Sequence, residues 1–496
     1  MPNAKQRIPA IAKLMQNRTM GKLFLGLIMP VINAQFLRSD IKQSIQSKFK
    51  DDIFQKPIRK DGQLMVRAMA MSLKRAYETG SLSPNVTAKI GSLLINNITH
   101  LSKKRTKLLE KKHRDFIPGF VMISPTNVCN LRCKGCYAGE NYDKHTLEFD
   151  LFDGVVQELK DTYNMRFFVI SGGEPFAYRS QGKTILDIFE KHPDCLFHVF
   201  TNSSMITDEV ASKLEKFGNV LIAVSVEGFK KETEDRRGPG IFEKIERAME
   251  MMRKHGLIFG ISVTPMKHNA EVLLSDEFVK FWFDKHGVSY AWYFQYMPIG
   301  LNPNPELLVT PEQRAVMWRK TWDFIKKGYF MGDFWNCGTV SKGCISSSGR
   351  GGYFHITWTG DITPCGFIPF KDKNPKLNNL YALRENHLSI DEGLHAPLFK
   401  AIRDFQDKQK KNARTGGKCA CQGGETYGCG NLMMPCPIKD NSLEFLKILK
   451  ETGAKPIDKG ASQYRQLISK GIMPKYNVAC HRTMDSIWKE NYLKKK

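Results

Sequence analysis

The chain has 496 residues and a formal net charge of +25, with 42% apolar and 25% charged residues. This composition is that of a globular protein and excludes an intrinsically disordered chain, and the length predicts two to four domains. The first 120 residues contain 23 Lys and Arg against 7 Asp and Glu. Such an excess predicts either helices with solvated basic faces or a segment that meets phospholipid headgroups or nucleic acid.

The N-terminal region, residues 1–116, mixes apolar positions with Lys and Arg and is predicted to be helical and basic. Its first residues lack the apolar core and small-residue cleavage site of a secretory signal. The apolar run at 23–32 is about half the length needed to cross a bilayer, although its basic flanks suit a bilayer interface. We therefore predict a cytoplasmic protein, with a peripheral position at the inner membrane surface as an open alternative. In that compartment clustered cysteines more often bind metal than form disulfides.

Short β-rich runs alternate with amphipathic helical patterns between residues 117 and 305. This alternation predicts βαβ units around a parallel sheet. Six units are too few for an eight-fold barrel, so we predict an α/β fold with a partial (β/α)6 barrel of the TIM type. The β-rich runs lie at 120–124, 166–171, 196–201, 220–225, 259–264 and 290–296.

Three cysteines follow the first of these runs at the tight spacing C-x3-C-x2-C: Cys129, Cys133 and Cys136. A zinc knuckle would require a fourth ligand from elsewhere in the chain. Thiolates also hold iron–sulfur clusters, and three of them on a four-iron cluster leave one iron open for chemistry. The spacing therefore favours a catalytic iron–sulfur cluster over a structural zinc site.

The second run ends in a Gly-Gly-Glu-Pro turn, formed by Gly172, Gly173, Glu174 and Pro175. Two glycines allow the backbone to approach a ligand closely. Glu174 and the exposed carbonyl groups can accept hydrogen bonds from an ammonium group. In parallel βα folds, chemistry takes place at the carboxyl ends of strands, which is where this turn and the cysteine loop both lie.

Together the cysteine loop and the Gly-Gly-Glu-Pro turn resemble the radical S-adenosylmethionine (radical SAM) superfamily, over residues 120–300. The resemblance implies that Cys129, Cys133 and Cys136 hold a [4Fe-4S] cluster whose open iron binds SAM. It also implies reductive cleavage of SAM to methionine and a 5′-deoxyadenosyl radical, which abstracts hydrogen from the substrate. In such a reaction the protein positions the substrate and excludes competing reactions.

The same resemblance implies a set of cofactor contacts. The Gly-Gly-Glu-Pro turn would hold the amino group of SAM, and Thr201 and Asn202 end the third strand beside it. Ser225 and Glu227 match ribose contacts of the superfamily, and Arg237 matches a contact to the SAM carboxylate.

One position departs from the superfamily pattern. The residue before the third cysteine is often aromatic and lies near the adenine, whereas this chain has Gly135, with Tyr137 after Cys136.

Eight further cysteines lie beyond residue 305 and suit two four-cysteine clusters. The segment ending in Cys365 resembles the SPASM domain, an auxiliary-cluster extension of radical SAM enzymes that modify peptides. We therefore expect a Cys-rich SPASM-like domain at 330–440, with one or two auxiliary clusters, and a helical extension at 441–496. A single cluster, or a zinc site with spare thiols, is the alternative. By chain order, one cluster is assigned to Cys337, Cys344, Cys365 and Cys436, and the other to Cys419, Cys421, Cys429 and Cys480. The twelfth cysteine, Cys195, adjoins an apolar run and is predicted to be a buried core thiol.

The predicted function is that of a radical SAM enzyme that modifies a peptide or protein and receives electrons from a donor such as flavodoxin or ferredoxin. Chemistry on a lipid at the membrane surface is the first alternative, because basic charge and an apolar run occur in the same N-terminal segment. RNA modification follows, supported by charge alone. A non-catalytic electron-transfer protein is the last alternative.

Overall fold

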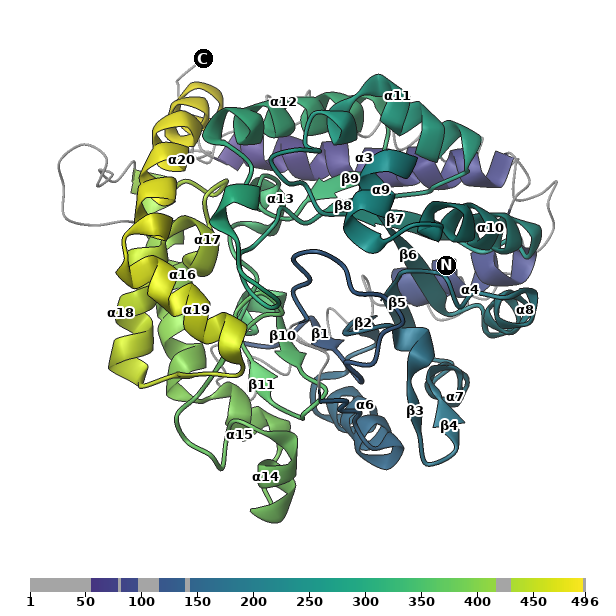
Figure 1. Cartoon of the computed structure of the whole chain (residues 1–496), viewed down its shortest axis with the longest axis horizontal. Helices are drawn as coiled ribbons and strands as arrows, with labels where there is room; N and C mark the ends of the chain where they lie inside the picture. Colours follow the sequence, from purple (N-terminus) through teal and green to yellow (C-terminus); the bar gives the residue numbers. More distant parts are fainter. Residues whose placement is uncertain (1–54, 79–81, 97–115, 139–142, 416–429, 494–496) are drawn as a thin grey trace, which may run out of the picture.

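The computed structural model describes residues 55–78, 82–96, 116–138, 143–415 and 430–493. A nine-stranded sheet forms the centre of the molecule, and helices surround it (Figure 1). Its strands are β1 Phe120–Ile123, β2 Phe167–Ile170, β5 Leu196–Thr201, β6 Val220–Val226, β7 Phe259–Val263, β8 Ala291–Tyr293, β9 Met331–Asp333, β10 Tyr353–Ile356 and β11 Ile362–Thr363.

The order of strands across the sheet is β11-β10-β1-β2-β5-β6-β7-β8-β9. Every neighbouring pair is parallel except β10 and β11, so eight strands run in one direction. Parallel strands are covered on both faces and therefore consist of almost continuous apolar residues. The run Val220–Val226 is an example, since its residues are buried or half-buried throughout. The predicted α/β fold with a parallel sheet is confirmed.

All six predicted β-rich runs form strands, but the sheet is larger than the partial (β/α)6 barrel that they suggested. Strands β9, β10 and β11 come from the region after residue 305 and extend the sheet at both edges. The predicted boundary at 305 therefore does not coincide with an edge of the sheet. The added strands have two to four residues each, too few to show a period of two in the sequence.

Outer helices connect consecutive strands, and their ends carry recognisable signals. Thr310 caps the longest of them in a capping box with Gln313, with Pro311 in its first turn, and Gly328 ends it at a φ of 93°. These helices are α6 Phe149–Tyr163, α7 Ile185–Lys191, α8 Asp208–Phe217, α9 Lys230–Arg237, α10 Ile241–Lys254, α11 Asp276–Val279 and α12 Pro311–Lys327.

The described part of the N-terminal region forms two helices, α3 Gln55–Glu78 and α4 Pro84–Asn96. Helix α3, purple in Figure 1, runs beside α12, and α4 lies beside α8. Met65 of α3 reaches the cavity described below. The apolar run at 23–32 lies outside the described residues.

The region after β9 is mainly helical, and its long helices α16 Pro397–Thr415, α18 Ser442–Thr452 and α20 Ile472–Trp488 lie at the left of Figure 1. A buried ion pair attaches it, because Arg314 of α12 bonds the Asp440 carboxylate at 2.5 Å and both side chains are fully buried. The helices of this part are α13 Gly338–Ser341, α14 Leu380–Glu385, α15 Ile390–Leu394, α16 Pro397–Thr415, α17 Pro437–Asp440, α18 Ser442–Thr452, α19 Lys459–Ser469 and α20 Ile472–Trp488.

Short elements complete the described structure. They are η2 Pro175–Ala177, β3 Arg179–Ser180, β4 Lys183–Thr184, η3 Val272–Leu274, η4 Lys280–Lys285, η5 Pro305–Leu307, η6 Gly349–Gly351, β12 Phe370–Lys371, β13 Lys455–Pro456 and η8 Lys489–Leu493.

Cys195 lies in the main hydrophobic core with no exposed surface, as predicted for a core thiol. Burial raises its pKa to about 12. Among the described residues, no helix has the length and apolar character needed to cross a membrane.

Candidate active site

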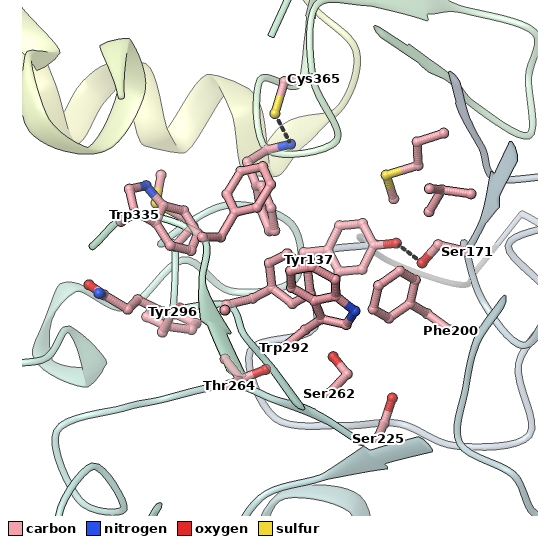
Figure 2. Close-up of a pocket in the computed structure, with 18 of the residues that line it drawn as sticks. Tyr137, Ser171, Phe200, Ser225, Ser262, Thr264, Trp292, Tyr296, Trp335 and Cys365 are labelled. Carbon is pink, nitrogen blue, oxygen red and sulfur yellow. Dashed lines mark hydrogen bonds between the residues drawn. The ribbon is translucent and has the colours of Figure 1, made fainter. Parts of the chain in front are cut away.

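A cavity of about 560 Å³ lies on the inner face of the sheet and at the carboxyl ends of its strands. Its wall includes the predicted cluster cysteines Cys129, Cys133 and Cys136, and also four cysteines from the region after residue 305. Figure 2 shows part of it, with the hydroxyl groups of Ser225 and Ser262 beside the indole ring of Trp292. Two sets of thiols distant in sequence thus share one cavity.

The three cluster cysteines lie on the loop between β1 and α6. Polar groups surround their sulfur atoms: the backbone N–H of Leu131 donates to Cys129 Sγ at 3.4 Å. The Asn202 side-chain amide lies 3.9 Å from the same sulfur, and an Arg237 nitrogen lies 3.9 Å from Cys133 Sγ. Donors of this kind stabilise the negative charge of ligating thiolates.

This loop fits an iron–sulfur cluster. Burial raises the pKa of Cys129 to about 11 and also raises the pKa of Cys136. Both thiols therefore keep their protons at neutral pH unless a metal centre displaces them, which metal ligation does. Within the described part of the chain, no three His, Cys, Asp or Glu side chains converge closely enough to hold a single metal ion. Ligands of a four-iron cluster bind different irons and do not need to converge in that way.

The two glycines of the Gly-Gly-Glu-Pro turn are required by the cysteine loop itself. Gly172 has a φ of 115°, and a Cβ there would lie 2.5 Å from the carbonyl oxygen of Thr126. A Cβ at Gly173 would lie 2.4 Å from the carbonyl oxygen of Val128. The backbone N–H of Gly173 donates to Thr126 O at 2.8 Å. The two glycines were predicted to let the backbone lie close to a ligand. In the structure they also let it lie close to the cysteine loop of the protein itself.

Glu174 is held in place by hydrogen bonds within the protein. Its carboxylate is fully buried and accepts hydrogen bonds from Thr201 Oγ1 at 2.6 Å, Asn202 N at 2.8 Å and Phe176 N at 3.1 Å. These three bonds use most but not all of the acceptor sites of the carboxylate, so its role as acceptor for a ligand ammonium group stays a prediction. Glu174 also joins the ends of β2 and β5. Pro175 begins η2 behind it and does not line the cavity.

Glu227, which was predicted to contact the ribose, is bonded to groups of the protein itself. It is fully buried, and it accepts hydrogen bonds from Arg236 at 2.5 Å, from Arg237 Nε at 3.0 Å and from the backbone N–H of Thr264 at 3.2 Å. Although burial opposes the charged form, the Glu227 carboxylate raises the pKa of Arg237. Glu227 therefore fixes two arginines, and it is the arginines that line the cavity.

Arg236 was missed by the sequence reasoning, although it directly precedes Arg237. Its Nε donates to the carbonyl oxygen of Lys134 at 3.2 Å, and Lys134 N donates back to Arg236 O at 3.0 Å. The cysteine loop is thus attached to helix α9 by two hydrogen bonds. Glu227 stabilises this attachment through its ion pair with Arg236.

Of the predicted cofactor contacts, six line the cavity beside the cluster cysteines: Gly172, Gly173, Thr201, Asn202, Ser225 and Arg237. Thr201 also bonds Glu174, whereas Ser225 points into the cavity in Figure 2. The turn residues are positioned by Tyr137, whose hydroxyl group contacts Ser171 Oγ at 2.6 Å and accepts from Gly172 N at 3.3 Å.

An aromatic ring lies against the position where this chain has Gly135. Gly135 has a φ of 63°, and a Cβ there would lie 2.8 Å from the ring of Tyr296. Tyr296 follows β8, and Trp292, Phe294 and Tyr296 all line the cavity at alternate positions. That alternation was visible in the sequence and could have marked all three rings as facing the cavity.

The wall is mostly uncharged, and twelve of its residues are aromatic. Of the described lining residues only four carry a formal charge: Arg132, Arg236, Arg237 and Asp333. His198 lines the cavity, but burial lowers its pKa to about 3, so it is neutral. The aromatic lining residues are Phe120, Tyr137, Phe167, Phe200, Trp292, Phe294, Tyr296, Phe330, Phe334, Trp335, Tyr353 and Phe367.

The cysteines after residue 305 divide into three groups. Cys337, Cys344, Cys365 and Cys436, which were predicted to share one cluster, all line the cavity. Cys480, predicted to belong to a second cluster, is buried in a separate cluster of apolar side chains. Its predicted partners Cys419, Cys421 and Cys429 lie outside the described residues.

Comparisons with known proteins agree with this site. Residues 123–273 match the family model of the radical SAM superfamily. An AdoMet-dependent heme synthase of Methanosarcina barkeri is 23% identical over 337 residues, which are 62% of this chain and 90% of that protein. Mycofactocin maturase MftC of Mycolicibacterium smegmatis is 32% identical over 160 residues, 31% of this chain and 38% of its own length. The crystal structure of Streptococcus suis SuiB bound to precursor peptide SuiA superimposes with a TM-score of 0.50 and 16% identity, over 67% of this chain and 74% of that one.

The fold and the cysteine loop therefore define a radical SAM domain, and the chain is a radical SAM enzyme. Its cofactors are a [4Fe-4S] cluster and S-adenosylmethionine. The match to this family favours an iron–sulfur cluster over zinc in the first cysteine loop.

Proposed function

We propose that this enzyme abstracts a hydrogen atom from an uncharged apolar or aromatic group of a peptide substrate. The observation that carries the proposal is the shared cavity, in which the cysteine loop shares a mostly uncharged wall with twelve aromatic residues. Such a wall favours an apolar group, because burying a charge without a partner is strongly unfavourable. Ligand cavities in proteins are typically apolar with a few polar groups that fix orientation.

Within this proposal the polar and the aromatic residues of the cavity wall have different functions. When bound, the cluster and SAM supply the 5′-deoxyadenosyl radical. On the cluster side, Arg237, Asn202 and Ser225 offer a guanidinium, an amide and a hydroxyl group to the polar parts of SAM. Next to these groups, rings such as Trp292 and Phe200 exclude water and position the substrate against that radical.

A peptide is supported as the substrate class by two observations. The fold resembles that of SuiB, which was crystallised with a precursor peptide. The second set of thiols resembles the auxiliary-cluster extension of peptide-modifying enzymes. We accordingly propose at least one auxiliary cluster in the region 330–440, with an external electron donor such as flavodoxin or ferredoxin.

A lipid is the second candidate, because the same uncharged wall would accept an acyl or prenyl chain. The basic N-terminal segment with its apolar run at 23–32 would then hold the enzyme at an anionic membrane surface. RNA is less consistent with the cavity, since four charged side chains among the described lining residues offer little to a phosphate backbone.

The test uses the full-length enzyme, reconstituted with iron and sulfide under anaerobic conditions and reduced in the presence of SAM. Peptide and lipid fractions from cells lacking the gene are added separately, and 5′-deoxyadenosine is measured by mass spectrometry. We expect the peptide fraction to increase its formation several-fold and the lipid fraction to leave it unchanged. Stimulation by the lipid fraction alone would overturn the peptide proposal, and no 5′-deoxyadenosine under any condition would overturn the reaction itself.

A further inference from the structure

Four residues stand in one row across strands β6, β7, β8 and β9, because each is the Cα partner of the next. They are Ser225, Ser262, Trp292 and Gly332. Side chains at paired positions point to the same face of a sheet, and all four residues line the cavity. The row therefore places two hydroxyl groups and one indole ring side by side inside the barrel (Figure 2).

Gly332 determines how the indole ring lies. A Cβ at this position would lie 2.6 Å from Cζ3 and 2.8 Å from Cε3 of Trp292. That edge of the ring therefore lies over the backbone of Gly332, where only a glycine leaves room for it. The nitrogen Nε1 belongs to the opposite edge of an indole, and Figure 2 shows it on the side of Ser262 and Phe200.

His198 reaches the same part of the cavity from β5. It is two positions before Phe200, so both side chains lie on one face of the strand, and both line the cavity. Its ring centroid lies 4.7 Å from that of Phe200 and 6.2 Å from that of Trp292. The side chain is 5% exposed. Two nitrogen-bearing rings thus meet inside the barrel.

Each of these two rings carries a polar atom without a partner. Trp292 Nε1 and His198 Nε2 are buried, and neither makes a hydrogen bond within the described part of the chain. The indole nitrogens of Trp318, Trp322 and Trp488 likewise have no partner there, but these residues do not line the cavity. Buried polar groups are rarely left unbonded in native proteins. At a cavity wall, a bound molecule can supply the missing partner.

The chemistry of these groups restricts that molecule. An indole N–H group only donates, whereas a neutral imidazole and the Ser262 hydroxyl group can donate or accept. The ligand must therefore present an acceptor to Trp292. A carboxylate would be buried without a cation, because the arginines of the wall either pair with Glu227 or lie exposed on the cysteine loop. An uncharged hydroxyl or carbonyl oxygen meets both requirements.

We propose that Trp292, His198 and Ser262 form a substrate subsite that binds an uncharged oxygen group, with Trp292 Nε1 as the donor. This inference rests on the proposed function and adds to it a group that the peptide substrate must carry beside its apolar or aromatic part. Ser225, which was predicted to contact the ribose of SAM, is the neighbour of Ser262 in the row. Trp292 would thus determine specificity next to the cofactor.

The experiment compares two probes of nearly the same shape, 4-fluorophenol and fluorobenzene. Full-length enzyme is reconstituted with iron and sulfide and saturated with SAM, without a reductant, so that no turnover occurs. Dissociation constants are obtained by 19F NMR titration. We expect the wild type to bind 4-fluorophenol about five-fold more tightly, as one net hydrogen bond would give. In Trp292→Phe the two affinities should become about equal. The ratio of the two constants is used because a change in cavity shape affects both probes.

Trp322→Phe is the matched control. It removes an indole N–H group that is equally unpartnered but belongs to the main core, so the ratio should stay as in the wild type. His198→Phe keeps an aromatic ring in place and should lower the ratio, which provides a second test if Trp292→Phe does not fold.

Equal affinities in the wild type, or no binding of either probe, would overturn the subsite. A wild-type ratio in His198→Phe together with Trp292→Phe would overturn it as well. If the peptide fraction still stimulates 5′-deoxyadenosine formation in that case, the subsite alone is wrong and the proposed function stands.

Discussion

Two groups of cysteines face the same cavity, and the chain assembles them in opposite ways. Cys129, Cys133 and Cys136 lie within eight consecutive residues on one loop. Cys344, Cys365 and Cys436 come from three segments that meet only when strands β10 and β11 and the C-terminal helices are in place. The first group can therefore be recognised by its spacing, whereas the second depends on the tertiary structure.

The two groups also differ in their surroundings. The loop cysteines have an arginine and an amide near their sulfur atoms, and Glu227 fixes that arginine. The second group has a phenol group 2.8 Å from Cys365 Sγ and aromatic rings nearby, among them Trp335 and Phe367, whose centroids lie 5.3 Å apart at an interplanar angle of 53°. The first group thus lies among polar and charged side chains, and the second among aromatic ones.

The largest effect is expected from removing one thiol of the loop. Cys133→Ala should abolish 5′-deoxyadenosine formation and remove the iron of one cluster, because cluster assembly and ligation are coupled. Iron analysis measures the cluster content, and mass spectrometry measures 5′-deoxyadenosine. Cys195→Ala is the control, since this core thiol lies outside the cavity and its loss should leave both readouts intact. Full product formation by Cys133→Ala would contradict the assignment of the loop.

A smaller effect is expected from disturbing the support of the loop instead of its ligands. Glu227→Gln removes the charge that pairs with Arg236 and Arg237, and both arginines are about nine-tenths buried. Removing one partner of a buried ion pair typically costs about 3–5 kcal/mol. We therefore expect a lower melting temperature and partial loss of cluster iron.

Glu209→Gln provides the comparison for that variant, because its pair with Lys213 is exposed and should be dispensable. Equal melting temperatures for the two variants would show that Glu227 does not support the site.

The smallest effect is expected at the turn that faces the cluster loop. Tyr137→Phe removes the hydroxyl group that contacts Ser171 and Gly172. One hydrogen bond contributes about 1 kcal/mol, which corresponds to a roughly five-fold weaker affinity for SAM. Anaerobic equilibrium dialysis measures the affinity for SAM. Tyr178→Phe, which loses a bond to Leu147 O away from the cavity, should leave SAM affinity unchanged. If both variants bind SAM like the wild type, Tyr137 does not position the turn.

Much of the fold followed from local patterns. Apolar runs predicted β1, β2, β5, β6 and β7 to within two residues at either end. The run at 290–296 formed a shorter strand, Ala291–Tyr293, because the backbone beyond it leaves the ladder and Tyr296 N bonds Pro265 O. Strands β9 and β10 were not predicted, although they are as long as β8 and β1, because they lie among cysteine- and glycine-rich segments and their place is defined by their neighbours in the sheet.

By itself, the sequence determined the parallel α/β fold, the cysteine loop and the Gly-Gly-Glu-Pro turn, because each is encoded in a few consecutive residues. The tertiary structure determined which contacts the side chains make. Glu174 and Glu227 were expected to contact a ligand, but buried carboxylates need internal donors, and each is bonded within the protein. The tertiary structure also determined which residues surround Cys344, Cys365 and Cys436, such as Tyr353 beside Cys365. Segments distant in the sequence come close only when the whole chain packs.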